Sequence, residues 1–194
     1  MNKTRVMVGV KIMLAACALV ALARPAVAIP DASTPTLLGV TLGGELGVAG
    51  QGVGSSAIPY YLYGQGGLAR LLAVKGELLG GGHRPTMKLL TAEFAELPTP
   101  LLSVSFEPGI VSFRNSVGPT LGLRATVGTP IKLRATGYAR VHFVESQTTT
   151  EFGAGVDYPI ANMLRLSVSA IHFDGGSEPA GTLFLAGLKL HVGI

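Results

Sequence analysis

Apolar and polar residues alternate with a period of two along most of the C-terminal half of the chain. The segment 182–194 puts Leu188, Leu190 and Val192 on one face and Lys189 and His191 on the other. This period is typical of a β-strand whose two faces meet different surroundings. Such runs are about as long as the 9–11 residues with which a tilted strand crosses a bilayer. The pattern therefore predicts amphipathic, membrane-crossing strands.

The same pattern, followed along the whole chain, predicts ten strands. They cover 38–48, 57–64, 68–79, 87–96, 101–107, 119–128, 131–144, 149–158, 163–173 and 182–194. The region 68–97 also fits two amphipathic helices, since Thr86 could cap a helix and Pro98 could end one. We favour strands, because a sheet in lipid has to close and leave no unpaired edge. An eight-stranded barrel, with 57–64 and a neighbouring segment as loops, is the alternative.

The composition fits a barrel that turns its apolar face outward. Hydrophobic residues make up 48% of the chain and charged residues only 13%. A soluble domain of this size usually carries more charge. Beyond the first 28 residues, no segment approaches the 18 uninterrupted apolar residues of a transmembrane helix. We therefore predict an all-β fold, an antiparallel up-and-down transmembrane β-barrel.

The first 28 residues read as a secretory signal peptide. Basic residues precede the apolar run 12–23, and Ala26-Val27-Ala28 forms a small-x-small cleavage site after Ala28. The predicted domains are thus 1–28, the signal peptide, and 29–194, the barrel. The chain has 15 basic and 11 acidic residues. Four of the basic residues lie in the leader, so the barrel is neutral overall and a nucleic-acid partner is not expected.

The single cysteine, Cys17, lies inside the predicted leader. The barrel can therefore form no disulfide and no thiolate metal site. Because 14–17 reads Leu-Ala-Ala-Cys, a lipidated N-terminus at Cys17 is an alternative to cleavage after Ala28. His83, His172 and His191 are dispersed without metal-ligand spacing, and we expect no metal and no cofactor.

The connections between the later strands are predicted to alternate in length. The segments 128–130 and 159–162 read as short turns, whereas 144–150 and 174–181 read as longer polar loops. In bacterial barrels the short turns face the periplasm and the long loops face outward. Pro108 cannot donate a ladder hydrogen bond, so it predicts a bulge or the point where its strand leaves the membrane.

Aromatic residues on the outer face suggest a membrane-interface girdle. Its predicted members are Phe143, Phe152, Tyr158 and Phe184. Phe173 has the parity of the other face. Either a bulge intervenes near Ala170 or the girdle is incomplete there.

The inward face carries charges of both signs. The predicted lumen network consists of Glu45, Arg124, Lys132, Arg134, Arg140, Glu151, Asp157, Arg165 and Lys189, with Lys75, Glu77 and Glu93 on the same face. Side chains nearly fill the interior of a barrel of this size. Buried charges have to be paired, so we expect internal salt bridges. The alternative is a narrow, anion-preferring channel lined by Arg124, Arg134, Arg140 and Arg165.

One cluster could carry hydrolytic chemistry. His142, Ser146 and Glu151 lie near one rim of the predicted barrel, where a nucleophile and its base could meet. Their spacing does not match that of the outer-membrane lipid deacylases. We therefore expect no enzymatic activity and no catalytic residues.

The C-terminal part resembles a known class of bacterial protein. The strand 152–158 reads Phe-Gly-Ala-Gly-Val-Asp-Tyr, a short turn contains Asn162, and the strand 164–168 and a final amphipathic strand follow. This arrangement resembles the small outer-membrane β-barrels of the opacity-protein and OmpA-like class. The resemblance covers about the last 75 residues well. It implies location in the outer membrane and recognition of the C-terminal strand by the barrel-assembly machinery, although such barrels usually end in Phe rather than Ile194.

Pattern and resemblance together predict a monomeric outer-membrane barrel surrounded by lipid. We expect a structural, surface-interaction or small-pore role, porin-like or opacity-protein-like. Two alternatives stay open: an outer-membrane lipid hydrolase, and a soluble secreted β-barrel that binds a small apolar ligand. The sequence specifies neither a transported solute nor a loop partner.

Overall fold

The computed structural model describes residues 40–50, 57–69, 72–81, 84–95, 102–128, 133–176 and 180–192, and these residues form ten β-strands. The strands are β1 (Val40–Ala49), β2 (Tyr60–Ala69), β3 (Leu72–Gly81), β4 (Arg84–Ala95), β5 (Leu102–Phe113), β6 (Ser116–Gly128), β7 (Arg134–Val144), β8 (Gln147–Pro159), β9 (Leu164–Gly175) and β10 (Gly181–Val192). Within these ranges no helix is long and apolar enough to cross a bilayer. The predicted cleavage site at Ala28, Cys17, Lys132 and Ile194 lie outside the described residues.

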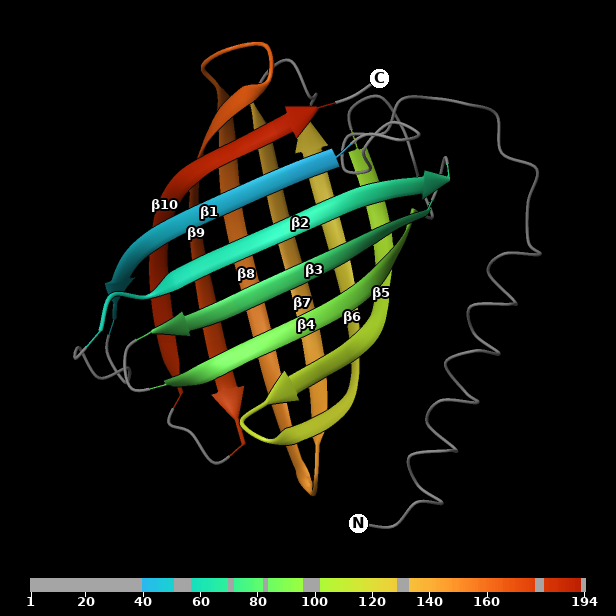
Figure 1. Ribbon diagram of the computed structural model, residues 1–194, viewed down its shortest axis with the longest axis vertical. Coiled ribbons are helices and arrows are strands. Elements are labelled where there is room, and N and C mark those ends of the chain that lie inside the picture. Colours follow the sequence, from blue (N-terminus) through green and yellow to red (C-terminus); the bar gives the residue numbers. More distant parts are fainter. Residues whose placement is uncertain are drawn as a thin grey trace.

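The ten strands form one closed antiparallel barrel (Figure 1). Each strand pairs with its neighbours in sequence, and β1 closes the barrel against β10 from Val40↔Val192 to Ala49↔Leu183. The prediction of ten strands is confirmed, and both the eight-stranded barrel and the helices in 68–97 are wrong. Closure explains why, because β2, β3 and β4 are needed to satisfy the backbone groups that an open sheet would expose to lipid.

The barrel has two distinct ends. The terminal end carries Val40 and Val192, the first and last described residues, which pair with each other. The distal end, at the lower side of Figure 1, carries the turns that join β5 to β6 and β7 to β8.

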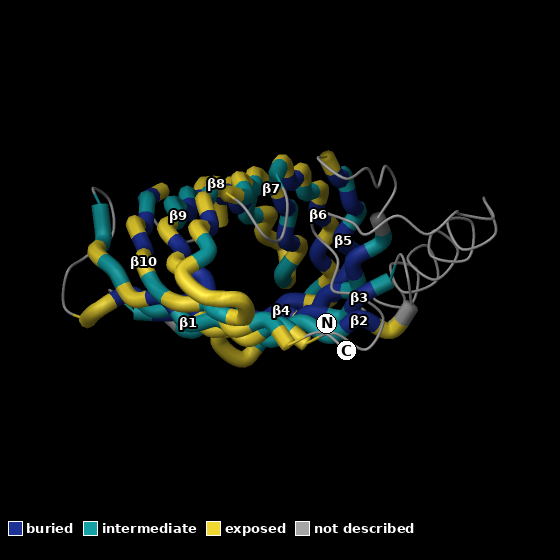
Figure 2. Tube along the Cα trace, turned by 90° about the horizontal axis from the view of Figure 1, so that it is seen from above, coloured by how far each residue is buried: buried dark blue, intermediate teal, exposed yellow. Residues whose placement is uncertain are grey.

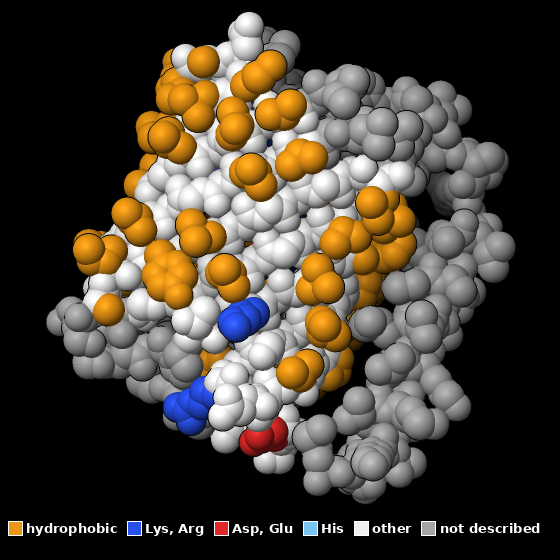
Figure 3. Space-filling view, in the orientation of Figure 1, with side chains coloured by type: hydrophobic (Ala, Val, Ile, Leu, Met, Phe, Trp, Pro, Cys, Tyr) orange, Lys and Arg blue, Asp and Glu red, His pale blue; other side chains and the backbone are white. Residues whose placement is uncertain are grey.

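The two faces of the sheet have opposite polarity. Leu188, Leu190 and Val192 are exposed on the outside, whereas Glu107 and Arg140 on the inner face are buried. Buried and exposed positions alternate along the strands in Figure 2. In Figure 3 hydrophobic side chains cover much of the visible outer face, and its few charged side chains gather toward the lower end. The predicted alternation, apolar outside and charged inside, is confirmed.

The predicted long loop at 144–150 is wrong. β7 and β8 are joined by a two-residue turn, Glu145-Ser146, and the polar residues of 147–150 continue β8. The turn Arg114-Asn115 joins β5 to β6 in the same way, so these strands also extend beyond the predicted limits of 107 and 119. Arg114 and Glu145 have φ values of 55° and 57°, as residues of tight hairpin turns do. Glu145 accepts a hydrogen bond from Ser116, which links the β7–β8 turn to the start of β6.

Pro108 lies inside β5, where the predicted bulge is absent and the strand continues to Phe113. Thr91↔Gly109 and Phe94↔Phe106 belong to one unshifted register with β4, and Pro108 pairs with Leu121 of β6. A proline is tolerated because the missing N–H only interrupts the β4–β5 ladder locally.

Phe173 faces the lumen and is 4% exposed. The registers of β9 with both of its neighbours run without a shift past Ala170. The strand therefore contains no bulge there, and Phe173 is not part of an outer aromatic girdle.

Candidate functional site

The inward-facing side chains form three layers along the barrel. β3 shows the change, with Leu79 near the distal end followed by Glu77 and Lys75 toward the middle. β10 begins at the distal end with buried Leu183 and Leu185 and reaches the terminal end at Lys189 and His191. We call these the apolar layer, the central charge layer and the terminal polar layer.

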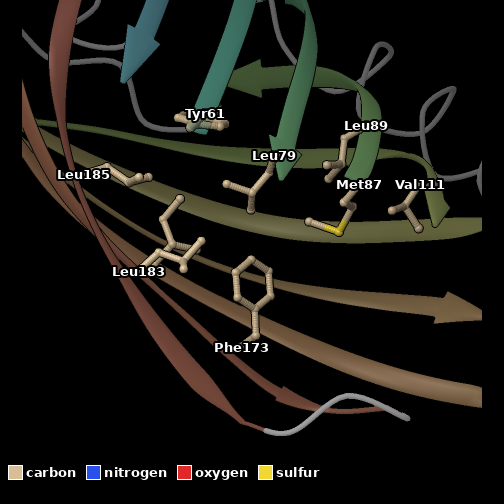
Figure 4. Close-up of a cluster of buried hydrophobic side chains, with 9 residues drawn as sticks. Tyr61, Leu79, Met87, Leu89, Val111, Phe173, Leu183 and Leu185 are labelled. Carbon is tan, nitrogen blue, oxygen red and sulfur yellow. The ribbon is translucent and has the colours of Figure 1, made fainter. Parts of the chain in front are cut away.

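The apolar layer is a cluster contributed by six strands around the distal half of the lumen. Figure 4 shows most of its side chains projecting toward one another. Its members are Tyr61, Leu79, Met87, Leu89, Val111, Ile171, Phe173, Leu183 and Leu185.

The central charge layer is organised by Arg140. Its Nη2 lies 2.8 Å from Glu77 Oε2 and 2.9 Å from Glu107 Oε2, and its Nη1 lies 3.6 Å from Glu151 Oε1. The Arg140 side chain is 1% exposed. Because Glu77, Glu107 and Glu151 belong to β3, β5 and β8, one guanidinium on β7 connects opposite walls of the barrel.

Each of these carboxylates has a further partner. Glu77 binds Lys75 at 2.7 Å, and Glu107 binds Arg124 at 2.5 Å. Glu151 accepts a hydrogen bond from Tyr138 at 2.6 Å and contacts His142 Nε2 at 2.9 Å. Multiple partners are what makes buried charges tolerable in a low-dielectric interior.

Two further groups complete the central charge layer. Tyr61 donates a hydrogen bond to Glu77. Glu93 accepts hydrogen bonds from Gln65 at 2.6 Å and from Ser105 at 2.9 Å. The layer is therefore built from carboxylates, cations and hydroxyl groups on most strands of the barrel.

The terminal polar layer centres on Asp157 and Glu45. Asp157 lies 2.6 Å from Lys189 and 2.8 Å from Arg134, and its backbone carbonyl accepts a hydrogen bond from Arg165 at 3.0 Å. Glu45 accepts hydrogen bonds from Ser167 at 2.6 Å and from Ser169 at 2.5 Å. These contacts join strands that are not neighbours, such as β8 with β10 and β1 with β9.

Two tyrosines of the lumen lie flat over glycines of the adjacent strand. Tyr138 pairs with Gly153, and Tyr63 pairs with Gly43. A Cβ added at either glycine would overlap the tyrosine ring. With no side chain beneath it, the Tyr138 ring lies 4.6 Å from the Arg140 guanidinium carbon, within range of a cation–π interaction.

Two separate cavities lie among the described residues of the lumen. The mouth cavity, of about 410 Å³, lies at the distal end between the apolar layer and the two tight turns. The inner cavity, of about 70 Å³, lies among residues of the central and terminal layers. The two cavities share no lining residue.

The structure places eight of the nine residues predicted for the charge network in the lumen, and the ninth, Lys132, lies outside the described residues. Glu107, which the sequence pattern did not place in the network, is fully buried in the lumen. Glu107 shares the inward parity of Ser103 and Ser105, but the proline that follows it suggested that the strand ended there. Parity alone would have found it.

His142, Ser146 and Glu151 do not form a catalytic arrangement in this structure. His142 contacts Glu151 through Nε2 and Thr120 Oγ1 through Nδ1, at 2.9 and 2.8 Å. Both ring nitrogens are thus occupied, whereas Ser146 is exposed in the β7–β8 turn. Within the described residues, no group of three or more His, Cys, Asp or Glu side chains is arranged to hold a metal ion.

The predicted girdle residues are exposed on the outer face. Phe143, Phe152 and Phe184 are 42%, 50% and 52% exposed, and Tyr158 is 58% exposed. Phe143 and Phe184 belong to the distal half of the barrel, and Tyr158 lies near the terminal end, where β8 pairs with the start of β9.

Comparison with known proteins gives no match to any family model and none to any curated protein sequence. Solved structures do match. The chain is similar to the KdgM porin, with a TM-score of 0.51 and 10% identity over 77% of this chain and 98% of that one. It is also similar to the NanC porin, with a TM-score of 0.52 and 7% identity over the same shares. The chain therefore has the fold of small transmembrane β-barrels, and its exposed apolar side chains fit an outer face surrounded by lipid.

Proposed function

We propose that this protein is a closed outer-membrane barrel with a structural or surface-interaction role, and that it is not an open diffusion pore. One observation carries this proposal: the ion pairs of Arg140 extend across the lumen between the two cavities. In the barrel, β7 and β3 are separated by three strands on one side and five on the other. The contact between Arg140 and Glu77 therefore crosses the interior rather than following the wall.

The pairing of the arginines argues against an anion-preferring channel. Arg124 binds Glu107, Arg134 binds Asp157, and Arg140 binds three carboxylates. Arg165 donates to the Asp157 carbonyl. A selective anion pore presents cations to the solute, whereas these cations are already engaged.

Closure of the sheet supports a monomer surrounded by lipid. Every described strand pairs along both of its edges, so the barrel presents no free edge to a second copy. We also propose that the assembly machinery recognises the C-terminal strand, and that the role is not enzymatic. The engaged imidazole of His142 supports the latter. Membership of the opacity-protein class is part of this proposal.

The proposal is tested by planar-bilayer recording of the purified barrel. We expect no steady conductance from the wild type. The double variant Arg140→Ala with Glu107→Ala removes one cation and one anion, leaves the net charge unchanged and opens the central charge layer. It is expected to give discrete conductance steps, which would also show that the assay detects inserted protein. Steady single-channel steps from the wild type would refute the closed barrel.

A further inference from the structure

The distal part of the lumen is lined with apolar side chains, whereas the interior of an outer-membrane barrel is ordinarily polar. Leu79, Met87, Val111, Phe173 and Leu183 are all inward-facing and no more than 7% exposed. They do not fill the space that they surround, because the mouth cavity of about 410 Å³ remains beside them. That volume is within the range of about 300–1,000 Å³ typical of small-molecule sites.

The cavity has an apolar wall, a polar rim and a closed floor. Leu79, Met87, Val111, Phe113, Phe173 and Leu183 form the wall. The rim carries neutral polar groups, among them Ser116, Gln147 and Thr149. Asn115 and Gln147 are exposed, so the cavity opens toward the distal end. At the floor, His142 is held between Thr120 and Glu151.

The charges around the cavity favour a neutral ligand. Among the described residues that line the cavity, His142 is the only buried ionisable one, and both of its ring nitrogens are engaged. The other two ionisable lining residues, Arg114 and Glu145, are exposed in the turns and have opposite signs. A charged ligand that entered the apolar wall would lose its hydration without gaining a partner. A neutral molecule with one polar group could bury its apolar part and keep that group at the rim.

We propose that the mouth cavity binds a small neutral apolar molecule with a single hydrogen-bonding group. The inference rests on the proposed function in one respect, because the central charge layer is the floor of the cavity. Met87 suits such a site, since its flexible thioether adapts to ligands of different shape.

The chain supplies its own probe for this site. It contains five methionines, and the described residues include two of them. Met87 lines the mouth cavity, and Met163 is exposed in the β8–β9 turn at the opposite end. With ¹³C-methyl methionine, each resonance can be assigned by a Met→Leu variant. Indole is the ligand to titrate into the full-length protein in nanodiscs. We expect a saturating shift of the Met87 methyl and none of the Met163 methyl.

A matched pair of variants locates the binding. Thr149 faces the cavity, and its neighbour Thr148 is exposed on the other face of β8. Thr149→Phe should fill the cavity and raise the half-saturating indole concentration at least tenfold, and Thr148→Phe should leave it unchanged. If Thr149→Phe fails to fold, Val144→Phe fills the same cavity from β7.

Three results would overturn the proposal: an unchanged Met87 resonance, linear and equal shifts of both methionines, or unaltered binding by a folded cavity-filling variant. Indole-3-acetate tests the preference for a neutral ligand, since equal affinity would contradict it. Conductance is measured separately, so an open pore that binds indole and a closed barrel that does not are distinguishable outcomes.

Discussion

Removal of Arg140 should be among the most destabilising single substitutions in this barrel. Its guanidinium lies within 2.9 Å of both Glu77 and Glu107 and is the one cation that contacts three carboxylates among the described residues. In Arg140→Ala, Glu77 would keep Lys75, and Glu107 would keep Arg124. The side chains of Arg140, Glu77 and Glu107 are buried, so water could not replace the lost partner. Loss of one partner from a buried ion pair costs about 3–5 kcal/mol, and we expect a value in this range.

Arg134→Ala is the matched control. Arg134 also pairs with a carboxylate, at 2.8 Å, but its side chain is 19% exposed. Its partner Asp157 would keep Lys189 at 2.6 Å. Because water and Lys189 compensate, we expect a cost of about 1 kcal/mol, near the upper end for accessible pairs.

The assay is urea unfolding of the barrel in lipid vesicles, followed by gel mobility of unheated samples and by far-ultraviolet circular dichroism. The double variant Arg140→Ala with Glu107→Ala completes a thermodynamic cycle. Its cost should be smaller than the sum of the single costs, because the second substitution removes a charge that the first left with fewer partners. If Arg140→Ala costs no more than Arg134→Ala, or if the cycle is additive, the ion pairs of the central charge layer do not stabilise the barrel.

Two further predictions test the outer face and the tyrosine–glycine contacts. Leu188→Arg should destabilise the barrel in vesicles by about 2–4 kcal/mol, and Val192→Arg, near the terminal end, by about 0–1 kcal/mol; equal costs in the same urea assay would contradict a lipid-facing β10. Gly153→Ala should lower the free energy of unfolding by about 1–3 kcal/mol, because the added methyl group displaces the Tyr138 ring. In the control Gly137→Ala, a Cβ would have no neighbour closer than 3.9 Å, and a cost as large as that of Gly153→Ala would show that Tyr138 does not depend on the glycine.

The number of strands and the faces of most residues could be predicted from the sequence, because a period of two is a local property. The ends of the strands were harder to predict from the sequence. The residues of 147–150 are polar on both faces, as a loop would be, yet they continue β8. Neither Arg114-Asn115 nor Glu145-Ser146 contains the glycine that often marks a two-residue hairpin turn. At 147–150, therefore, the composition resembles that of a loop where the structure has a strand.

The partners of the lumen charges could not be predicted, because they depend on how the sheet closes. Parity places Arg140 and Glu77 on the same face but gives no reason to join β7 with β3. Their contact exists because closure of ten strands brings opposite walls within reach of a long side chain. The apolar layer does have a local signal in the sequence, because Leu183-Phe184-Leu185 is apolar on both faces of the strand.

That apolar triplet shows why hydrophobicity alone does not describe this protein. Phe184 is 52% exposed on the outside, and its neighbours Leu183 and Leu185 are each 2% exposed in the lumen. The outer side chain gains no hydrophobic stabilisation from contact with a partner, because lipid is as apolar as protein. The inner ones do, because the alternative for the lumen is water. Hydrophobic burial can therefore drive side-chain packing only inside the barrel. At the distal end the side chains of the apolar layer do not fill the lumen, and an apolar ligand could occupy the remaining cavity.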